Sequence, residues 1–337
     1  MAKEKTVGSP QVSIVVPVYN EEPNIPDLIL RLVKVMDGSG RSYEIVGVDD
    51  GSKDKSLEML LDHREKYPQL VVVELNRNFG QHAAIFAGFE AARGDVIVTI
   101  DADLQNPPEE IEKLLELWDK GHDVVGTIRK GRQDTWFRRT LSWMVNRTTN
   151  WMTGLKISDY GCMLRAYDRH VVNAMKEGQE VSTFIPALAA NFARNVTEVE
   201  VAHGARTKGE SKYSIIRLMM LHFDLITSFS MWPLRLLILL GTLIAFVGIG
   251  FGVLLMFLRF VMGSEWAAQG VFTLFAILFV FVGAQFFGLG LLGEYLGRVY
   301  LEVRKRPRFI VRKVHEGIPA GGGRKAAAKS KKASEAE

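Results

Sequence analysis

The sequence predicts an α/β head with a mostly parallel, doubly wound sheet, followed by two helices that span a membrane. Three features predict this architecture. Apolar runs of strand length alternate with amphipathic helical segments over roughly the first 130 residues. Polar and often acidic motifs directly follow several of these runs. Two long stretches without any charge occupy the last third of the chain.

Continuous apolar runs predict the strands, because a strand buried on both faces is apolar throughout. These strands are expected at residues 12–18, 44–48, 70–75, 96–100 and 123–127. Apolar residues at helical spacing, from Ile25 to Val33, predict the first helix. Further helices are expected at 55–64, at 82–92 and after Pro107, where proline and two acids favour a helix start. This alternation favours a parallel sheet.

The two uncharged stretches are residues 236–258, with 23 residues, and 266–293, with 28. Since about 20 helical residues cross a bilayer core, each is long enough to span a membrane. The short connection between them predicts a hairpin. The expected organisation is a polar tail (1–10), a catalytic head (11–212), an amphipathic interface helix (213–233), two spans (234–258 and 266–293), a juxtamembrane segment (294–320) and a disordered basic tail (321–337).

Charge predicts the orientation in the membrane. Residues 1–10 contain no apolar stretch typical of a secretory signal. Residues 301–337 contain eleven Lys/Arg against four Asp/Glu, a net charge of +7, although the whole chain is only +4. The positive-inside rule therefore places the head and the C-terminal tail in the cytoplasm, and the two spans predict a multi-pass membrane protein.

Two segments combine arginine with large aromatic residues, residues 136–152 and residues 213–232. Basic, aromatic amphipathic helices are typical of a membrane interface, which is the interpretation favoured here over ordinary core helices. Cys162 is the only cysteine, which excludes an intrachain disulfide and a cysteine zinc site. It is expected to be a small buried residue. Gly288 to Gly293 matches a dinucleotide fingerprint, but it lies inside an apolar span without a preceding strand.

The strongest chemical motif is Asp101-Ala102-Asp103-Leu104-Gln105, which follows the fourth predicted strand. Ligands of open α/β sheets bind at the carboxyl ends of the strands. Two carboxylates placed there predict a site for a hard cation, Mn²⁺ or Mg²⁺, together with nucleotide phosphates. The alternative is a solvated aspartate turn that caps the next helix.

A second acidic motif, Asp49-Asp50-Gly51-Ser52, ends the second predicted strand. A short acid at this place can accept hydrogen bonds from a nucleoside, and Gly51 permits a tight turn. Alone the motif is ordinary turn chemistry. His82 either contacts a sugar or caps its helix. The cationic residues that are candidates to bind phosphate, or alternatively the membrane surface, are Arg129, Arg138, Arg206 and Lys212.

Taken together, several motifs resemble glycosyltransferases of family 2, which have the GT-A fold. They are residues 15–22 (VVPVYNEE), 49–52 (DDGS), 76–81 (NRNFGQ) and 101–108 (DADLQNPP). Within that family the chain resembles the polyprenyl-phosphate glycosyltransferases, a group that includes dolichyl-phosphate mannose synthase, over roughly residues 12–314. Further resemblance is to transferases of 4-deoxy-4-formamido-L-arabinose, which belong to the lipid A aminoarabinose pathway behind polymyxin resistance. It is carried by residues 132–138, 159–167, 182–186, 209–214 and 285–300.

The resemblance implies a UDP-sugar donor, an undecaprenyl phosphate acceptor and inverting transfer at the cytoplasmic face of a bacterial inner membrane. It implies metal contact through Asp103 and Gln105, with Asp101 nearer the nucleotide, and a positioning role for Asp159 near the acceptor. Asp101, Asp103 and Asp159 are the expected catalytic residues. The expected nucleotide-sugar residues are Pro17, Tyr19, Glu21, Asp50, Asn78, Gln81, Asp101 and Ala102.

The resemblance also raises the hypothesis of a homo-tetramer, and nucleic acid is not an expected partner. Other classes remain as alternatives. One is a glucosyl or mannosyl transferase acting on undecaprenyl or dolichyl phosphate, because spacing does not reveal the sugar. Another is a non-catalytic nucleotide-binding scaffold. A processive polysaccharide synthase is disfavoured because the Gln-x-x-Arg-Trp motif is absent, and a flippase because the spans contain few polar residues.

Overall fold

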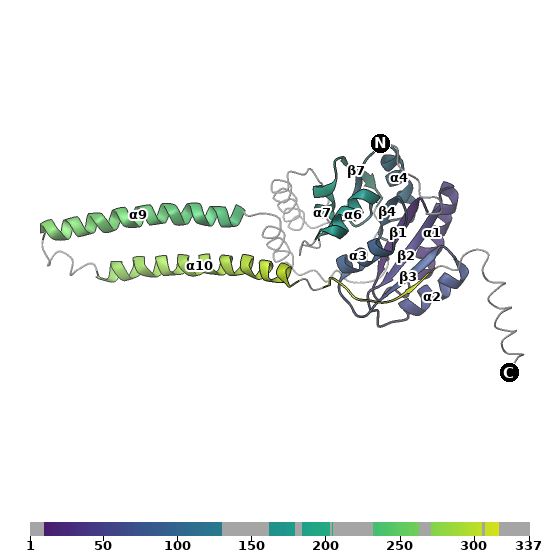
Figure 1. Ribbon diagram of the computed structural model, residues 1–337, viewed down its shortest axis with the longest axis horizontal. Helices are drawn as coiled ribbons and strands as arrows, with labels where there is room; N and C mark the ends of the chain where they lie inside the picture. The colour runs from purple at the N-terminus through teal and green to yellow at the C-terminus, as the bar shows by residue number, and fades with distance from the viewer. Residues whose placement is uncertain are drawn as a thin grey trace, which may run out of the picture. The chain divides into compact units, whose positions relative to one another are not determined.

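The structure is a computed structural model that describes residues 10–129, 162–178, 184–202, 204, 232–262, 271–304 and 307–316. The chain divides into two compact units. One carries the sheet and its helices, and the other carries the two long helices (Figure 1). The predicted interface segments at 136–152 and 213–231 lie outside the described residues.

Among the described residues, eight strands form one sheet in the order β7-β5-β6-β4-β1-β2-β3-β8. Pairing is parallel except at β6, which is antiparallel to β4 and β5, and at β8, which is antiparallel to β3. The strands are β1 (Val12–Val18), β2 (Tyr43–Asp49), β3 (Leu70–Leu75), β4 (Val96–Thr99), β5 (Val124–Arg129), β6 (Arg165–Asp168), β7 (Val196–Val201) and β8 (Val311–His315).

Helices cover both faces of this sheet (Figure 1). The first face packs against α1 (Ile25–Ser39), α2 (Ser56–Lys66) and α4 (Ile111–Asp119), which follows the short 3-10 helix η1 (Pro108–Glu110). The second packs against α3 (Gln81–Ala91), α6 (Arg169–Glu177) and α7 (Ile185–Phe192). Along β1, Ile14 and Val16 face one core cluster and Val15 faces the other, as the two-residue period of a strand requires. The doubly wound α/β prediction is confirmed.

The five predicted strands occur within two residues of their expected ends. Cys162 is buried, as predicted, with 1% of its surface exposed. Sequence analysis did not predict β6, β7, α6, α7 or β8.

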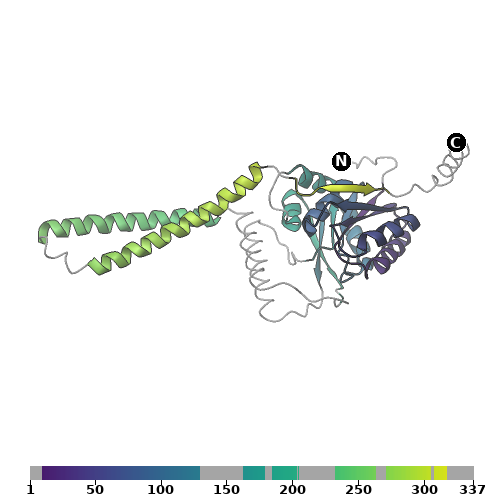
Figure 2. The ribbon, with the colours of Figure 1, turned by 90° about the horizontal axis from the view of Figure 1, so that it is seen from below.

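Strand β8 returns the chain to the sheet after the long helices (Figure 2). The backbone N–H of Asn76 donates to the Ile310 carbonyl at 3.0 Å, and Arg312 pairs with Glu74 at 2.9 Å. The sequence prediction placed this segment in a juxtamembrane region separate from the head, whereas the structure adds residues 311–315 to the head. Basic side chains are common on edge strands. The same basic residues can therefore form a strand and also resemble the positive charge that marks a cytoplasmic segment.

The second unit contains α9 (Trp232–Met262) and α10 (Val271–Val303). In the described part of the chain, Leu234–Met262 is the helix that meets the length and composition expected of a span, with mean hydropathy 2.6. Gly288 lies against Leu237 and Gly248 against Phe281, so the two helices pack antiparallel (Figure 1). Residues 288–293 lie within α10, which confirms that the dinucleotide match is spurious.

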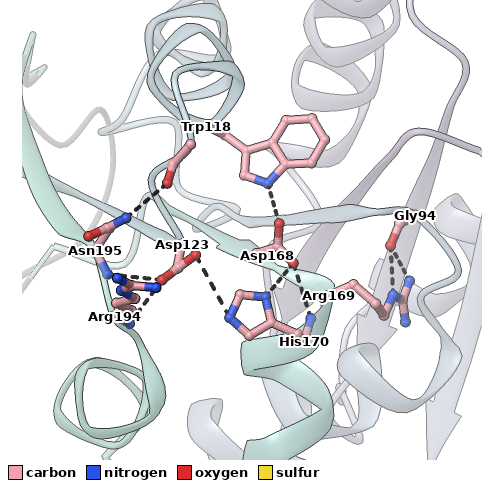
Figure 3. Close-up of polar contacts among 9 residues, drawn as sticks. Gly94, Trp118, Asp123, Asp168, Arg169, His170, Arg194 and Asn195 are labelled. Atoms are coloured by element: carbon pink, nitrogen blue, oxygen red, sulfur yellow. Dashed lines mark hydrogen bonds and ion pairs between the residues drawn. The ribbon is translucent and has the colours of Figure 1, made fainter. Parts of the chain in front are cut away.

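A polar network lies at the edge of the sheet opposite the acidic loops, and its Trp118–Asp168 contact is buried (Figure 3). Trp118 Nε1 donates to the Asp168 carboxylate at 2.8 Å, and Asp168 also accepts the backbone N–H of His170. Asp123 accepts the backbone N–H groups of Arg194 and Asn195 at 2.9 Å each. The network joins α4, β5, β6, α6 and the turn before β7.

We expect Trp118→Phe to lower the free energy of unfolding by about 1–3 kcal/mol, because Asp168 loses a donor inside the protein. Lys113→Gln on the same helix removes an ion pair to Glu110 with a half-exposed lysine and should cost less than about 1 kcal/mol. Denaturant unfolding of the full chain in detergent, followed by circular dichroism, compares the two variants. Equal costs would contradict the role given to the Trp118–Asp168 contact.

Candidate active site

The acidic and polar motifs meet at one edge of the sheet. Strands β4, β1, β2 and β3 are neighbours and run parallel, so their carboxyl ends share that edge. The chain order reverses between β1 and β4, since β2 and β3 lie to one side and β4 to the other. Ligands of open α/β sheets bind at such a switch point. Hydrogen bonds between the successive loops build the site there.

The loop after β1 is bonded to the loop after β2. The backbone N–H of Asn20 donates to Ser52 Oγ at 3.1 Å, and the Lys53 N–H donates to Asn20 Oδ1 at 2.8 Å. Asn20 has φ +55°, a left-handed conformation that asparagine tolerates. The Glu21 N–H donates to Ser56 Oγ at 2.9 Å. These contacts fix the backbone beside Tyr19 and Glu21.

The carboxylate of Asp50 joins the loop after β2 to the loop after β3. Its two oxygens accept the backbone N–H groups of Phe79, at 2.7 Å, and Gly80, at 2.9 Å. Asp50 is 2% exposed. Burial raises the pKa of Asp50 above its usual value, and the two backbone donors oppose that shift. In the structure Asp50 thus holds the two loops together. Its contact with uridine stays a prediction.

Gly51 permits the close approach of these two loops. Its φ is +65°, and a Cβ atom there would lie 2.6 Å from the carbonyl carbon of Arg77 and 2.7 Å from the nitrogen of Asn78. Both are backbone atoms, which cannot move aside as a flexible side chain can. Any other residue at this position would push Asn78 and the following loop away from β2.

Gln81, the first residue of α3, connects the third loop to the acidic motif. Its Nε2 donates to Asp101 Oδ1 at 2.6 Å. In the acidic loop the Gln105 N–H donates to Asp103 Oδ1 at 3.1 Å, and the Gly204 N–H, just beyond β7, donates to the Gln105 carbonyl at 2.8 Å. The intervening Leu104 has φ +59°, which is unfavourable for a leucine. Strained residues of this kind concentrate at functional sites.

The oxygen groups of this loop fit a hard divalent cation that is bound together with a diphosphate. Asp101, Asp103 and Gln105 are half-buried, at the water-facing edge of the sheet. Among the described residues, no cluster of three His, Cys, Asp or Glu side chains is arranged to hold a metal alone. Mg²⁺ sites commonly use one or two carboxylates and take their remaining ligands from substrate phosphates and water.

The structure brings most of the predicted residues to this edge. Pro17 lies near the end of β1, Tyr19 is 40% exposed just beyond it, and Ala102 is buried in the acidic loop. Arg129 ends β5, whose direction matches β4, so it lies at the same edge of the sheet. Asp159, Arg138, Arg206 and Lys212 lie outside the described residues. Sequence analysis missed Ser56 and Gly204, and it gave no role to Ser52 of the second acidic motif, because their hydrogen bonds depend on contacts between distant loops.

His82 follows Gln81 and is neutral at pH 7. Its Nδ1 is enclosed by protein and has no hydrogen-bond partner in the described structure, and its ring meets Phe184 edge-on at 5.8 Å. Burial lowers the pKa of His82 to about 4. It therefore adds no positive charge beside Asp101.

Comparison with known proteins identifies the family. The family description "Glycosyl transferase family 2" matches residues 13–175. The chain is 53% identical, over 304 residues, to undecaprenyl-phosphate 4-deoxy-4-formamido-L-arabinose transferase of Aeromonas hydrophila, covering 90% of this chain and 93% of that protein. The chain belongs to glycosyl transferase family 2. It is a glycosyltransferase, and the GT-A class expected from its motifs is confirmed.

Two solved structures are similar at lower identity. Glucosyl-3-phosphoglycerate synthase from Mycobacterium tuberculosis, in complex with Mn²⁺ and UDP-glucose, is 16% identical, with a TM-score of 0.48 over 65% of this chain and 77% of that one. S. aureus TarS 1–349, in complex with UDP, is 18% identical, with a TM-score of 0.40 over 57% of this chain and 60% of that one.

We expect Gly51→Ala in this glycosyltransferase to weaken UDP binding at least about tenfold, because the new methyl group displaces the loop at Asn78. Gly40→Ala is the matched control. Gly40 has nearly the same φ, +66°, but open space around it. The control should lose about 1 kcal/mol of stability from backbone strain and keep its UDP affinity. Calorimetric titration with UDP measures both, and equal affinities of the two variants would contradict the steric argument.

His82 should make stability depend on pH. In the unfolded chain this histidine binds a proton with its ordinary pKa of 6.5, whereas burial in the folded protein lowers that pKa to about 4. Stability is therefore full above pH 6.5 and falls as the pH drops towards 4, by up to about 3 kcal/mol. Unfolding of the full chain at pH 7 and pH 5 should show this loss in the wild type and a smaller loss in His82→Gln. An identical pH dependence in the variant would refute this assignment.

Proposed function

We propose that this enzyme transfers 4-deoxy-4-formamido-L-arabinose from its UDP-sugar to undecaprenyl phosphate, with inversion, at the cytoplasmic face of the inner membrane. The product would serve lipid A modification and polymyxin resistance. One observation carries the proposal: the chain is 53% identical over 90% of its length to a transferase of this name. The similarity extends beyond the family 2 match into the long helices, which is where a lipid acceptor would be met.

The proposed reaction is a direct displacement at the anomeric carbon of the sugar. The acceptor phosphate is largely dianionic at pH 7 because the second pKa of a phosphate monoester is near 6, so it needs no strong general base. An acceptor oxygen attacks the anomeric carbon, the bond to the diphosphate breaks, and UDP leaves with the electron pair. Attack from the face opposite to UDP inverts the anomeric centre. The rate then depends mainly on how the acceptor and the donor are placed and on how well their phosphate charges are screened.

The acidic loop would position the diphosphate of the donor. Asp103 and Gln105 would hold a Mn²⁺ or Mg²⁺ ion, which when bound offsets the charge on the departing diphosphate. Gln81 fixes the Asp101 carboxylate through their 2.6 Å contact. Arg129 is a candidate for binding phosphate at the same edge. We assign Arg138, Arg206 and Lys212 to the phosphate groups and Asp159 to acceptor positioning.

Strand β8 supports the proposed membrane topology. Because β8 pairs with β3, the chain beyond α10 lies in the same sheet as the chain before α9. A sheet cannot be divided by a bilayer, so the long helices between these parts must cross it an even number of times. Two crossings, one by each helix, leave both the head and the C-terminal segment in the cytoplasm.

The proposal predicts metal-dependent transfer that depends on Asp103. In membranes containing the full chain, undecaprenyl phosphate and Mn²⁺, the UDP-formamido-arabinose donor should release UDP and yield a lipid-linked sugar. Asp103→Asn should lower kcat about a hundredfold or more, because the departing charge loses its screening.

Asp119→Asn is the matched control, since Asp119 pairs with Arg41 at the C-terminal end of α4 and should leave turnover unchanged. UDP-glucose and GDP-mannose complete the donor panel. A preference for either of these sugars would overturn the proposed substrate. Unchanged turnover in Asp103→Asn would overturn the metal site.

A further inference from the structure

We propose that Asn106 and Cys162 are positioning residues that hold the acidic loop in its metal-binding shape. This inference rests on the proposed function of that loop. Asn106 directly follows Gln105, yet it is only 3% exposed. Its side chain is therefore enclosed by protein, whereas the acids before it lie at the water-facing edge of the sheet.

The Asn106 side chain accepts a hydrogen bond from a buried group of polar side chains. The Cys162 thiol donates to Asn106 Oδ1 at 3.5 Å, and Thr127 Oγ1 lies 2.9 Å from the Cys162 sulfur. Thr127 Oγ1 also lies 2.8 Å from the Leu164 carbonyl, which is the stronger acceptor for its single proton. Cys162 and Thr127 are 1% and 0% exposed. Cys162 is thus a hydrogen-bonding residue and more than the small apolar filler that its sequence context suggests.

The hydrogen bond between Cys162 and Asn106 joins two parts of the fold. Asn106 ends the loop after β4, and Cys162 lies just before β6. Strand β6 pairs with both β4 and β5. The contact between Cys162 and Asn106 therefore fastens the end of the acidic loop to the rigid centre of the sheet.

The acidic loop needs such fastening because its backbone is strained. Leu104 adopts φ +59°, a conformation that leucine disfavours and that an unrestrained loop would leave. The Gly204 N–H donates to the Gln105 carbonyl and the Cys162 thiol donates to Asn106, so the two residues that follow Leu104 are both held. Because the Gln105 N–H also donates to Asp103 Oδ1, holding this end of the strained turn favours one spacing of Asp103 and Gln105. Residues that orient metal ligands commonly change metal affinity by 10- to 100-fold when they are replaced.

The test measures Mn²⁺ binding apart from catalysis. Electron paramagnetic resonance of Mn²⁺ added to the full chain with UDP, without acceptor, gives the Mn²⁺ affinity. We expect Asn106→Ala to weaken it about tenfold and Cys162→Ala about threefold, and Cys162→Ser, which keeps a donor, to restore it. The Mn²⁺ concentration for half-maximal turnover should rise by the same factors, with kcat at saturating Mn²⁺ changing less.

Val171→Ala is the control for lost packing. Val171 is fully buried on α6 and belongs to the core cluster on the other face of the sheet. It should lower the thermal midpoint at least as much as Cys162→Ala while leaving Mn²⁺ affinity unchanged. If Asn106→Ala behaves like Val171→Ala, with a lower midpoint and unchanged Mn²⁺ affinity, the positioning role is wrong. If the wild type neither binds Mn²⁺ with UDP nor transfers sugar, the proposed function itself fails.

Discussion

Two backbone N–H groups, those of Phe79 and Gly80, point at the carboxylate of Asp50 inside the protein. A buried carboxylate is costly unless hydrogen bonds compensate it, and buried N–H groups need acceptors equally. The buried carboxylate of Asp50 and the two buried N–H groups therefore compensate each other. The contact sets the distance between the loops after β2 and β3, and Gly51 removes the side chain that would prevent it. The next residue, Gln81, donates to Asp101 of the acidic motif, so the proposed metal-binding and nucleotide-binding loops are connected by hydrogen bonds.

The same loop also contacts the segment that follows the long helices. The backbone N–H of Asn76, at the start of the loop that Asp50 holds, bonds to Ile310, just before β8. Arg308 stacks 4.4 Å over the Phe86 ring of α3 and donates to the Gly178 carbonyl at 2.8 Å. The segment that follows the long helices thus contacts the strand, loop and helix that form one side of the candidate nucleotide site. The proposed reaction, with a soluble donor and a lipid acceptor, would need such a connection.

The sequence predicted those parts that local patterns encode. Continuous apolar runs predict buried parallel strands, and acids at the ends of those strands predict a candidate site. Strand β7, Val196–Val201, alternates valine with polar residues, a signal of a half-buried strand that was available but missed. Strand β8, Val311–His315, is basic and exposed, so it looked like a topology signal. The hydrogen bonds of Asp50 and the left-handed backbone of Leu104 depend on contacts between distant loops, which no spacing along the chain reveals.

Hydrogen–deuterium exchange of the peptide spanning residues 76–81, in the full chain without nucleotide, tests most directly whether Asp50 organises the site. In the wild type the amides of Phe79 and Gly80 should exchange slowly, because Asp50 accepts both. Asp50→Asn turns one acceptor oxygen into a donor that faces an N–H group, so exchange should accelerate at least about tenfold. Equal exchange rates in the two proteins would contradict the account.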